Sequence, residues 1–563
     1  MRTRATLVGL LVTTSWCFGA ERNSAVAPKD TTARPRIVNI INFVRGVEPR
    51  NDTDLFEPLV QQVRLARQHN LPTTFLVQYD AMLQERFVKL LRSELTDRDE
   101  IGAWLELAQP QVEAAGLKWR GRFPWDWHTD VGFTIGYTPA ERERLMDEYM
   151  RLFKKTFGRL PRSVGCWLLD APTLAYLADK YGVTAACVCR DQVGTDGYTL
   201  WGGYWNQAYY PSRRNGFMPA QTDAQQIPIP VFRMLGSDPI YQYDNGIGQT
   251  AQGVETLEPV YAGGAGGGSK PEWVRWFFDT TFGSPCLAFA YTQVGQENSF
   301  GWPRMKDGLT DQVALVAELA KAGKLRVETL GESGRWFRKT FPTTPATAVT
   351  ALKDWKHEGR ASVWYNSRYY RVNLFWNKSG FRVRDIHRFD ERYAERYLTE
   401  PVTTPSCTYD TLPVLDGFAW STKDELAGIR PVGRPSDATS APTPPRTGEP
   451  TVTEAGPDTL VITMSLADAD TLEVRCEPTM LRFKVVDGSA SPDWALAMTW
   501  AAGKTVPIVR TEPDKIVYRH NGFVYVVRCA TGTLTAETDA SAVTLTPVDG
   551  QIALDMAADH RPQ

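Results

Sequence analysis

Apolar runs of strand length alternate with amphipathic segments over the first part of the chain. Residues 164–169 and 183–189 are two such runs, and between them Leu174, Leu177 and Ala178 recur at helical spacing. Two apolar strands joined by a short helix form a βαβ unit, whose strands are parallel and buried on both faces. Such units bind ligands outside the carboxyl ends of their strands, so functional residues are expected there.

The same alternation extends over residues 35–325. It predicts strands at 37–44, 71–80, 100–107, 164–169, 183–189, 227–235 and 286–291, and helices at 55–69, 139–157, 172–181 and 309–322, with a further helix ending near 95. Thr138 and Glu141 form a capping box at the start of one helix. Strands and helices that alternate in this way predict an α/β fold, a closed or nearly closed (β/α)7-8 barrel.

The pattern changes near Arg326. Segments such as 362–366 and 370–376 alternate with period two and have no helix between them, which indicates strands. We predict a β-rich domain over 326–430, a Pro/Thr/Ser-rich linker or insertion at 431–450, and a second β-rich segment over 451–557, together forming a β-sandwich. If the last segment is an accessory domain, a chain cut near Gly448 should remain folded.

Composition and charge limit the class of protein and its partners. A chain of 563 residues is too long for one ordinary core, so two or three domains are expected. The net charge of −2 gives no reason to expect nucleic acid or an anionic membrane as a partner. The 18 tryptophans and 21 tyrosines are more informative, because flat amphipathic rings stack on sugars, although large cores also use them.

The N-terminus has the outline of a secretory signal peptide over residues 1–20. Arg2 and Arg4 precede a short apolar run at 5–12, and small residues follow at a plausible cleavage point. Cys17 is an alternative attachment point for a lipid anchor. The apolar run is too short to cross a bilayer, and no later stretch is long enough. We therefore predict a secreted or periplasmic protein without a membrane span.

Charged and aromatic residues collect where the predicted strands end. Two carboxyl groups suffice for glycoside hydrolysis, one as acid and one as base or nucleophile. The candidate catalytic residues are Glu106, Asp126, His128, Asp170 and Glu297. The candidate substrate-binding residues are Arg45, Arg120, Arg122, Arg190, Asp191, Trp205, Tyr209 and Asp238. Forked guanidinium groups suit the carboxylate of an acidic sugar.

Each candidate also has a structural interpretation. Asp170 would serve as a helix N-cap, and Asp191 could simply pair with Arg190. His128 could be a packed core residue instead of a group that Asp126 orients for catalysis. Glu106 could face solvent on the far side of the rim. The aromatic candidates could pack within their own loop, and exposed arginines are usually solvated.

Two stretches are similar to a known barrel superfamily. Residues 69–77 and 100–102 resemble the second and third strands of the polysaccharide deacetylase (NodB-like) barrels, which the family 57 and family 38 glycosidases share. Residues 166–170 resemble the family 57 strand that ends in a catalytic carboxylate. The resemblance covers about residues 37–300 and implies the barrel fold. The arginine-rich rim with an Asp/His pair also resembles the inverting exo-sialidases of glycoside hydrolase family 156.

The deacetylase metal ligands are missing from the matching positions. The deacetylases hold a metal with an aspartate pair after the first strand and two histidines after the third. Here the first position reads Ile41-Asn42-Phe43, and the histidine positions hold Trp104 and Ala108. The six histidines of the chain include no pair with a ligand spacing. We therefore expect no metal and no other cofactor, and an activity that survives chelation.

These observations lead to two hypotheses. The first is a secreted, exo-acting glycoside hydrolase that acts on an oligosaccharide or glycoconjugate, with an acidic sugar such as sialic acid as a candidate substrate. Asp170 would be its general acid, because apolar surroundings should raise the pKa of this carboxyl group. The second is a metal-independent carbohydrate-binding barrel or a deacetylase-like esterase. Retaining and inverting mechanisms both fit the sequence.

Overall fold

The computed structural model describes residues 34–188, 203–249, 252–262, 266–409, 411–433, 448–466, 470–486, 494–536 and 542–557. The predicted signal peptide and Cys17 lie outside the described residues, as do Arg190 and Asp191. No helix in the described ranges is both long enough and apolar enough to cross a membrane.

The N-terminal half forms a nearly closed parallel barrel, as the sequence predicts. Its strands follow one another around the sheet in chain order, and β10 pairs with β1. They are β1 (Arg36–Val44), β2 (Thr74–Val77), β3 (Glu100–Trp104), β4 (Ser163–Gly165), β5 (Ala185–Val188), β9 (Val231–Arg233) and β10 (Ala290–Val294). The sheet ends at β6 (Ala208–Tyr209), which is antiparallel to β9. All carboxyl ends of the parallel strands therefore meet at one rim.

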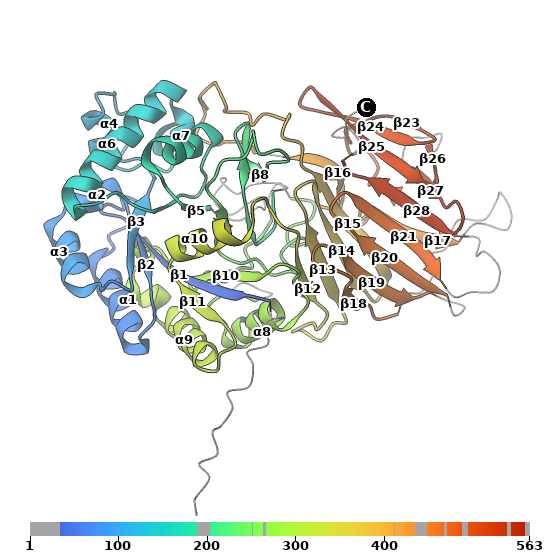
Figure 1. The fold of residues 1–563 in the computed structure, drawn as a ribbon, viewed down its shortest axis with the longest axis horizontal. Coiled ribbons are helices and arrows are strands. Elements are labelled where there is room, and N and C mark those ends of the chain that lie inside the picture. The colour runs from blue at the N-terminus through green and yellow to red at the C-terminus, as the bar shows by residue number, and fades with distance from the viewer. Residues whose placement is uncertain are drawn as a thin grey trace, which may run out of the picture. The chain divides into compact units, whose positions relative to one another are not determined.

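Helices follow the strands and cover the outside of the sheet (Figure 1). The main ones are α1 (Phe56–His69), α3 (Glu85–Glu94), α6 (Pro139–Phe157), α7 (Ala171–Tyr181), α8 (Pro271–Gly283) and α9 (Trp302–Lys321). Shorter helices are α2 (Tyr79–Met82), α4 (Gln109–Ala114) and α5 (Thr129–Gly132), with single 3-10 turns at η1 (Thr134–Gly136) and η2 (Asn298–Phe300). The predicted capping box of Thr138 and Glu141 is present at the start of α6.

The barrel extends beyond the point where the sequence predicts helix-free β structure. β11 (Arg326–Glu328) pairs in parallel with the first half of β1, and α10 (Leu330–Thr340) follows it. The three-residue strand is too short to show a pattern, and α10 turns its buried Leu330 and Phe337 toward the core. The prediction that the β-rich domain starts at Arg326 is therefore corrected: the β-rich domain starts after α10.

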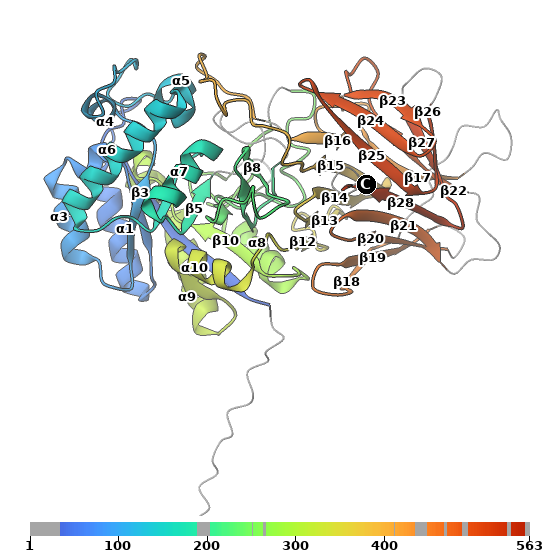
Figure 2. The ribbon, with the colours of Figure 1, turned by 45° about the horizontal axis from the view of Figure 1, so that its top comes forward.

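The C-terminal region confirms the predicted sandwich, which occupies the yellow-to-red part of the ribbon (Figure 2). One antiparallel sheet contains β12 (Thr347–Ala351), β13 (Ala361–Asn366), β14 (Tyr370–Asn377), β15 (Gly380–Arg388), β17 (Gly428–Gly433), β22 (Trp494–Thr499), β27 (Ala542–Thr546) and β26 (Thr533–Ala536), with β16 (Leu412–Asp416) beside β15. The other contains β18 (Thr451–Glu454), β19 (Leu460–Ser465), β20 (Thr471–Cys476), β21 (Met480–Val486), β28 (Gln551–Asp555), β25 (Phe523–Thr531), β24 (Lys515–His520) and β23 (Ile508–Glu512). Trp376 and Met464 join the two sheets, with Nε1 and Sδ 3.2 Å apart.

Both β-rich segments contribute to the first sheet. β17 pairs with β22 along its whole length, from Gly428 opposite Thr499 to Gly433 opposite Trp494. The chain after Thr451 therefore completes a sheet that begins at Thr347. The expectation that a cut near Gly448 leaves a folded protein is not supported by this topology, because it would separate paired neighbouring strands.

Candidate active site

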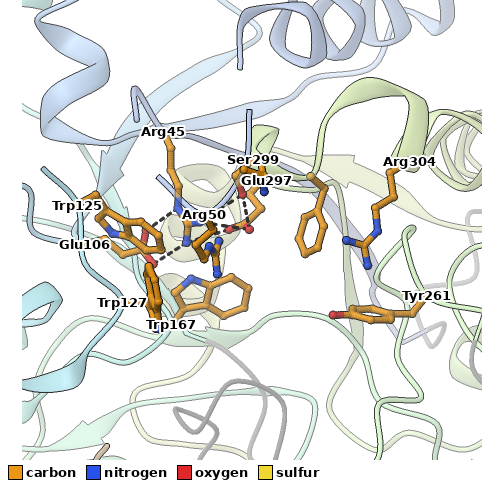
Figure 3. A pocket seen from close by; sticks show the side chains of 12 residues that line it. Arg45, Arg50, Glu106, Trp125, Trp127, Trp167, Tyr261, Glu297, Ser299 and Arg304 are labelled. Carbon is orange, nitrogen blue, oxygen red and sulfur yellow. Dashed lines mark hydrogen bonds and ion pairs between the residues drawn. The ribbon is translucent and has the colours of Figure 1, made fainter. Parts of the chain in front are cut away.

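A cavity of about 220 Å³ opens at the carboxyl ends of the barrel strands (Figure 3). Arg45 follows β1, Glu106 follows β3, Trp167 follows β4 and Glu297 follows β10. The remaining lining residues are Arg50, Asn51, Trp125, Trp127, Tyr261, Ser299, Phe300 and Arg304. The structure thus brings together three of the residues that the sequence singles out, Arg45, Glu106 and Glu297.

Arg45 is buried at the centre of this rim. Its Nε and Nη2 donate to the two oxygens of Glu106 at 2.8 Å each, a forked pair. Nη2 also lies 3.1 Å from Glu297 Oε2, and Nη1 lies 3.3 Å from Glu48 Oε2. Nη1 further donates to Ser299 Oγ at 3.2 Å. One guanidinium group therefore contacts the side-chain carboxyl groups of three different segments.

The backbone around Arg45 and Glu297 is fixed by Asn298. Its side chain accepts a hydrogen bond from Arg45 N and donates one to Arg45 O, both at 2.9 Å. Gly295, just before this segment, has φ 116°, and a Cβ there would lie 2.0 Å from Ile41 O. Only glycine allows the chain after β10 to pass so close to β1.

Glu106 is held by donors on both oxygens. Trp104 Nε1 donates to Oε2 at 2.8 Å, in addition to the Arg45 fork. The Trp104 ring is itself stacked on Phe43 at 4.2 Å between centroids. These donors fix the position of the Glu106 carboxyl group at the rim. The sequence alternative, a solvent-facing Glu106, is excluded by its complete burial.

The pKa values of Glu48 and Glu297 are shifted in opposite directions. Arg50 holds Glu48 through Nε at 2.7 Å and Nη2 at 2.5 Å, and the pKa of Glu48 is lowered because these contacts and Arg45 outweigh burial. Glu297 has no guanidinium of its own. Burial raises its pKa, Arg45 opposes the change, and Glu106 adds to it. Two arginines thus serve three carboxyl groups, and burial favours the protonated form of Glu297.

Tryptophan rings form the walls of the cavity. The Arg45 guanidinium lies 4.1 Å from the centroid of Trp125, and that of Arg50 lies 4.9 Å from the same ring. Trp167 meets Trp104 edge to face. The attraction between these guanidinium groups and the face of Trp125 keeps Arg45 and Arg50 in place. The arrangement gives a compact cavity in which aromatic and charged side chains surround two carboxyl groups.

Asp170, the residue on which the sequence hypothesis rests, is not among the lining residues of this cavity. Its Oδ1 accepts from Thr173 N at 2.9 Å and from Arg142 Nη1 at 3.0 Å, and its Oδ2 accepts from Thr134 Oγ1 at 2.5 Å. It is the N-cap of α7 and fully buried. These contacts favour the capping interpretation over the catalytic one.

Asp126 and His128 also differ from the expected arrangement. Asp126 accepts from Arg122 Nε at 2.9 Å and Nη2 at 2.7 Å, and from the backbone N of His128 at 3.2 Å. None of these bonds is made to the imidazole. Although burial raises the pKa of Asp126, the bonds from Arg122 and the backbone lower it to about 2. Arg120 donates to Gly136 O at 2.6 Å, on a different part of the loop.

The other described candidates make packing and hydrogen-bond contacts away from this cavity. Trp205 is buried and stacked on Trp364 at 4.3 Å between centroids. Tyr209 is buried and donates to Gly216 O at 2.8 Å. Asp238 accepts from Trp273 Nε1 at 2.7 Å and from two backbone N–H groups of the following turn. These contacts favour a packing role for Trp205 and Tyr209 over a role in binding a sugar.

Several lining residues were not named as candidates from the sequence. They are Asn51, Trp125, Trp127, Trp167, Tyr261, Ser299, Phe300 and Arg304. A signal was available for two of them, since Ser299 and Phe300 follow the seventh predicted strand within ten residues of its end. Tyr261 comes from a loop that carries no strand-end signal.

The rim does not fit the metal of a deacetylase. Among the residues that the structure describes, no group of three His, Cys, Asp or Glu side chains could hold a metal ion. At one of the matching histidine positions Trp104 donates to Glu106, and the Arg45 guanidinium already brings positive charge to that carboxylate. A divalent cation there would meet like charge.

Comparisons with known proteins show the fold. No protein-family model matches the sequence, and no curated protein matches it. Among solved structures, the "putative glycoside hydrolase/deacetylase" of Parabacteroides distasonis is 18% identical, with a TM-score of 0.50 over 68% of this chain and 90% of that chain. At this identity the similarity shows a common fold alone.

Two further structures are less similar. The "probable polysaccharide deacetylase" of Pseudomonas aeruginosa PAO1 is 13% identical, with a TM-score of 0.33 over 55% of this chain and 93% of that chain. A family 57 branching enzyme of Thermococcus kodakaraensis is 10% identical, with a TM-score of 0.28 over 55% of this chain and 71% of that chain.

Proposed function

We propose that the chain is a glycoside hydrolase in which Glu297 is the general acid and Glu106 is the nucleophile. The observation that supports this most is the pair of buried carboxyl groups on one guanidinium at the barrel rim, inside a chamber walled by tryptophan. The name of the Parabacteroides protein, which has the same fold, agrees with this reaction class.

The roles follow from the environment of each carboxyl group. Glu297, whose pKa is raised by burial, can hold a proton and give it to the oxygen of the leaving group. Glu106, whose two oxygens are held in place by Arg45 and Trp104, can attack the anomeric carbon as the glycosidic C–O bond breaks, forming a glycosyl ester. Water then cleaves this ester and gives its proton to Glu297, so that both groups return to their starting states.

The spacing favours retention of configuration. Glu106 Oε1 and Glu297 Oε2 lie 2.8 Å and 3.1 Å from the same atom, Arg45 Nη2. The two oxygens can therefore be no more than about 6 Å apart, below the separation of ~6.5–9.5 Å typical of inverting enzymes. This geometry argues against the inverting mechanism that a resemblance to family 156 would imply.

The proposal extends to substrate and location. A cavity of about 220 Å³ is smaller than most ligand pockets and suits one terminal sugar ring, which supports exo action on an oligosaccharide or glycoconjugate. Arginines on the cavity wall support an acidic sugar, such as sialic acid. The charged and apolar pattern of residues 1–20 supports export.

The test compares three isosteric variants on aryl glycosides and aryl sialosides. Glu106→Gln and Glu297→Gln should each lower kcat/KM at least about a hundredfold. Glu100→Gln is the matched control, because Glu100 is also buried but opens β3 at the opposite end of the strand from Glu106. It should keep near-normal turnover.

Leaving-group dependence then separates the two roles. A dinitrophenyl leaving group needs no acid, so it should restore much of the activity of Glu297→Gln and none of that of Glu106→Gln. If both variants turn over aryl glycosides as fast as Glu100→Gln does, the assignment is wrong. If no glycoside is cleaved but acetylated sugars are, the deacetylase-like esterase is correct instead.

A further inference from the structure

We propose that Arg304 binds the carboxylate of the substrate and so sets its class, a sugar that carries a carboxylate group. The proposal rests on the function above only in taking the ligand to be a sugar. Of the other arginines that the sequence singles out, Arg45 is bound by Glu106, Arg120 and Arg122 do not line the cavity, and Arg190 lies outside the described residues.

Arg304 stands across the cavity from the catalytic pair. In Figure 3 its guanidinium lies on the side of Tyr261, away from Arg45, Glu106 and Glu297. Arg304 belongs to the first turn of α9, directly after the turn that carries Glu297. The chain after β10 therefore supplies the proposed acid to one side of the cavity and a cation to the other.

The other arginines of the cavity are already neutralised. Arg45 is bound by Glu106 and Arg50 by Glu48. For Arg304, the described residues provide no carboxylate partner, and the first turn of α9 has no acidic residue. The two arginines of the neighbouring loop, Arg120 and Arg122, do not line the cavity.

Two ring contacts hold the Arg304 guanidinium in the cavity wall. It lies 4.9 Å from the centroid of Phe300 and 5.9 Å from that of Tyr261. Stacking of this kind orients the planar fork without using its N–H groups, which stay available for a ligand. The N-terminal end of the twenty-residue helix α9 adds a favourable potential for negative charge at the same place.

Charge then fixes the orientation of the sugar. The carboxylate of the substrate is drawn toward Arg304, because the two arginines nearer the catalytic pair already have carboxylate partners. The anomeric carbon then faces the catalytic pair. A neutral sugar of the same size would fit the cavity but leave the forked donors of Arg304 without an acceptor.

Binding of free monosaccharides tests this without relying on catalysis. Trp125, Trp127 and Trp167 line the cavity, so intrinsic fluorescence reports occupancy, and calorimetry supplies an independent measurement. Glucuronic acid and N-acetylneuraminic acid are the acidic probes, and glucose is the neutral one. We expect at least one acidic sugar to bind at least about tenfold more tightly than glucose at low ionic strength, and added salt to reduce the difference.

Variants assign the effect to one residue. Arg304→Gln should weaken the acidic sugar at least about tenfold and leave glucose unchanged. Arg304→Lys should give an intermediate loss, since it keeps the charge but not the fork. Lys306→Gln, which removes a positive charge from the same helix outside the cavity lining, should have no effect. Arg304 is exposed, so these variants should unfold at the wild-type temperature.

The outcomes separate this proposal from the preceding one. Equal binding of acidic and neutral sugars, or unchanged affinity in Arg304→Gln, overturns the carboxylate subsite even if glycosides are hydrolysed. Selective binding through Arg304 without hydrolysis of any glycoside supports the subsite and overturns the hydrolase instead. A preference between glucuronic acid and N-acetylneuraminic acid identifies which acidic sugar the cavity takes.

Discussion

Replacing Arg45 by methionine should destabilise the fold in a way that depends on pH. In the wild type, Glu106 and Glu297 outweigh the effect of burial and raise the pKa of Arg45, so it stays charged at every accessible pH. Arg45→Met keeps much of the volume but leaves Glu106 and Glu297 buried without a cation. Breaking one buried pair costs about 3–5 kcal/mol, so we expect a loss at least in this range at pH 7.

The pH dependence follows from the sign of the pKa shift. Burial already raises the pKa of Glu297, and removing Arg45 raises it further. When the folded-state pKa of a carboxyl group exceeds its unfolded value, the group favours folding most at low pH. The free energy of unfolding is then greatest below the unfolded pKa, about 4.3, and falls as pH rises through the folded pKa. The variant should therefore approach wild-type stability near pH 4–5 and lose most above neutrality.

Urea unfolding between pH 4.5 and 8.5 measures the effect, and Arg50→Met is the control. Arg50 pairs with Glu48 in the same cluster but is partly exposed, so its loss should cost no more than about 1 kcal/mol. A destabilisation of Arg45→Met that is the same at both ends of the pH range would refute the reasoning. So would an Arg50→Met variant that is equally unstable.

Three further predictions concern the rest of the chain. Burial, with a contribution from Asp170, raises the pKa of Glu395 to about 8, so its contribution to wild-type stability should fall as pH rises from about 4.3 through 8, and Glu395→Gln should show a smaller fall in thermal melts over this range. Asp170→Asn should lose about 3 kcal/mol or more in urea unfolding, because it leaves Arg142 unpaired, while turnover per folded molecule stays within a few-fold of wild type. A chain ending at Gly448 should be insoluble or show no cooperative unfolding, since β17 loses its partner β22; a cooperative transition would contradict the shared sheet.

Local signals in the sequence were enough for much of the barrel. Thr138 and Glu141 predict the start of α6 because a capping box depends on residues three apart. The apolar runs locate the strands, although they extend past the paired residues. β4 (Ser163–Gly165), for example, overlaps the predicted 164–169 only at 164–165, because apolar side chains continue into the buried rim after pairing stops.

Contacts between distant segments could not be predicted in this way. The pairing of β17 with β22 joins residues more than sixty positions apart, and no local pattern specifies it. The same limit applies to the site. Arg45, Glu106 and Glu297 were each recognised at a strand end, but only the closure of β10 on β1 shows that they share one cluster. Asp170 has the same kind of sequence signal, yet its partners Thr134 and Arg142 make it a structural residue.

The interleaved sandwich has a consequence for how the protein is made. β17 can pair with β22 only after β22 has been synthesised, and β22 in turn pairs with β27 near the end of the chain. During synthesis, the edge of the sheet that begins at β12 therefore stays open until almost the whole chain has emerged. An unpaired edge strand readily captures strands from other molecules. Conditions that slow translation before Trp494 should increase aggregation of nascent chains, whereas the barrel, complete by α10, can form early.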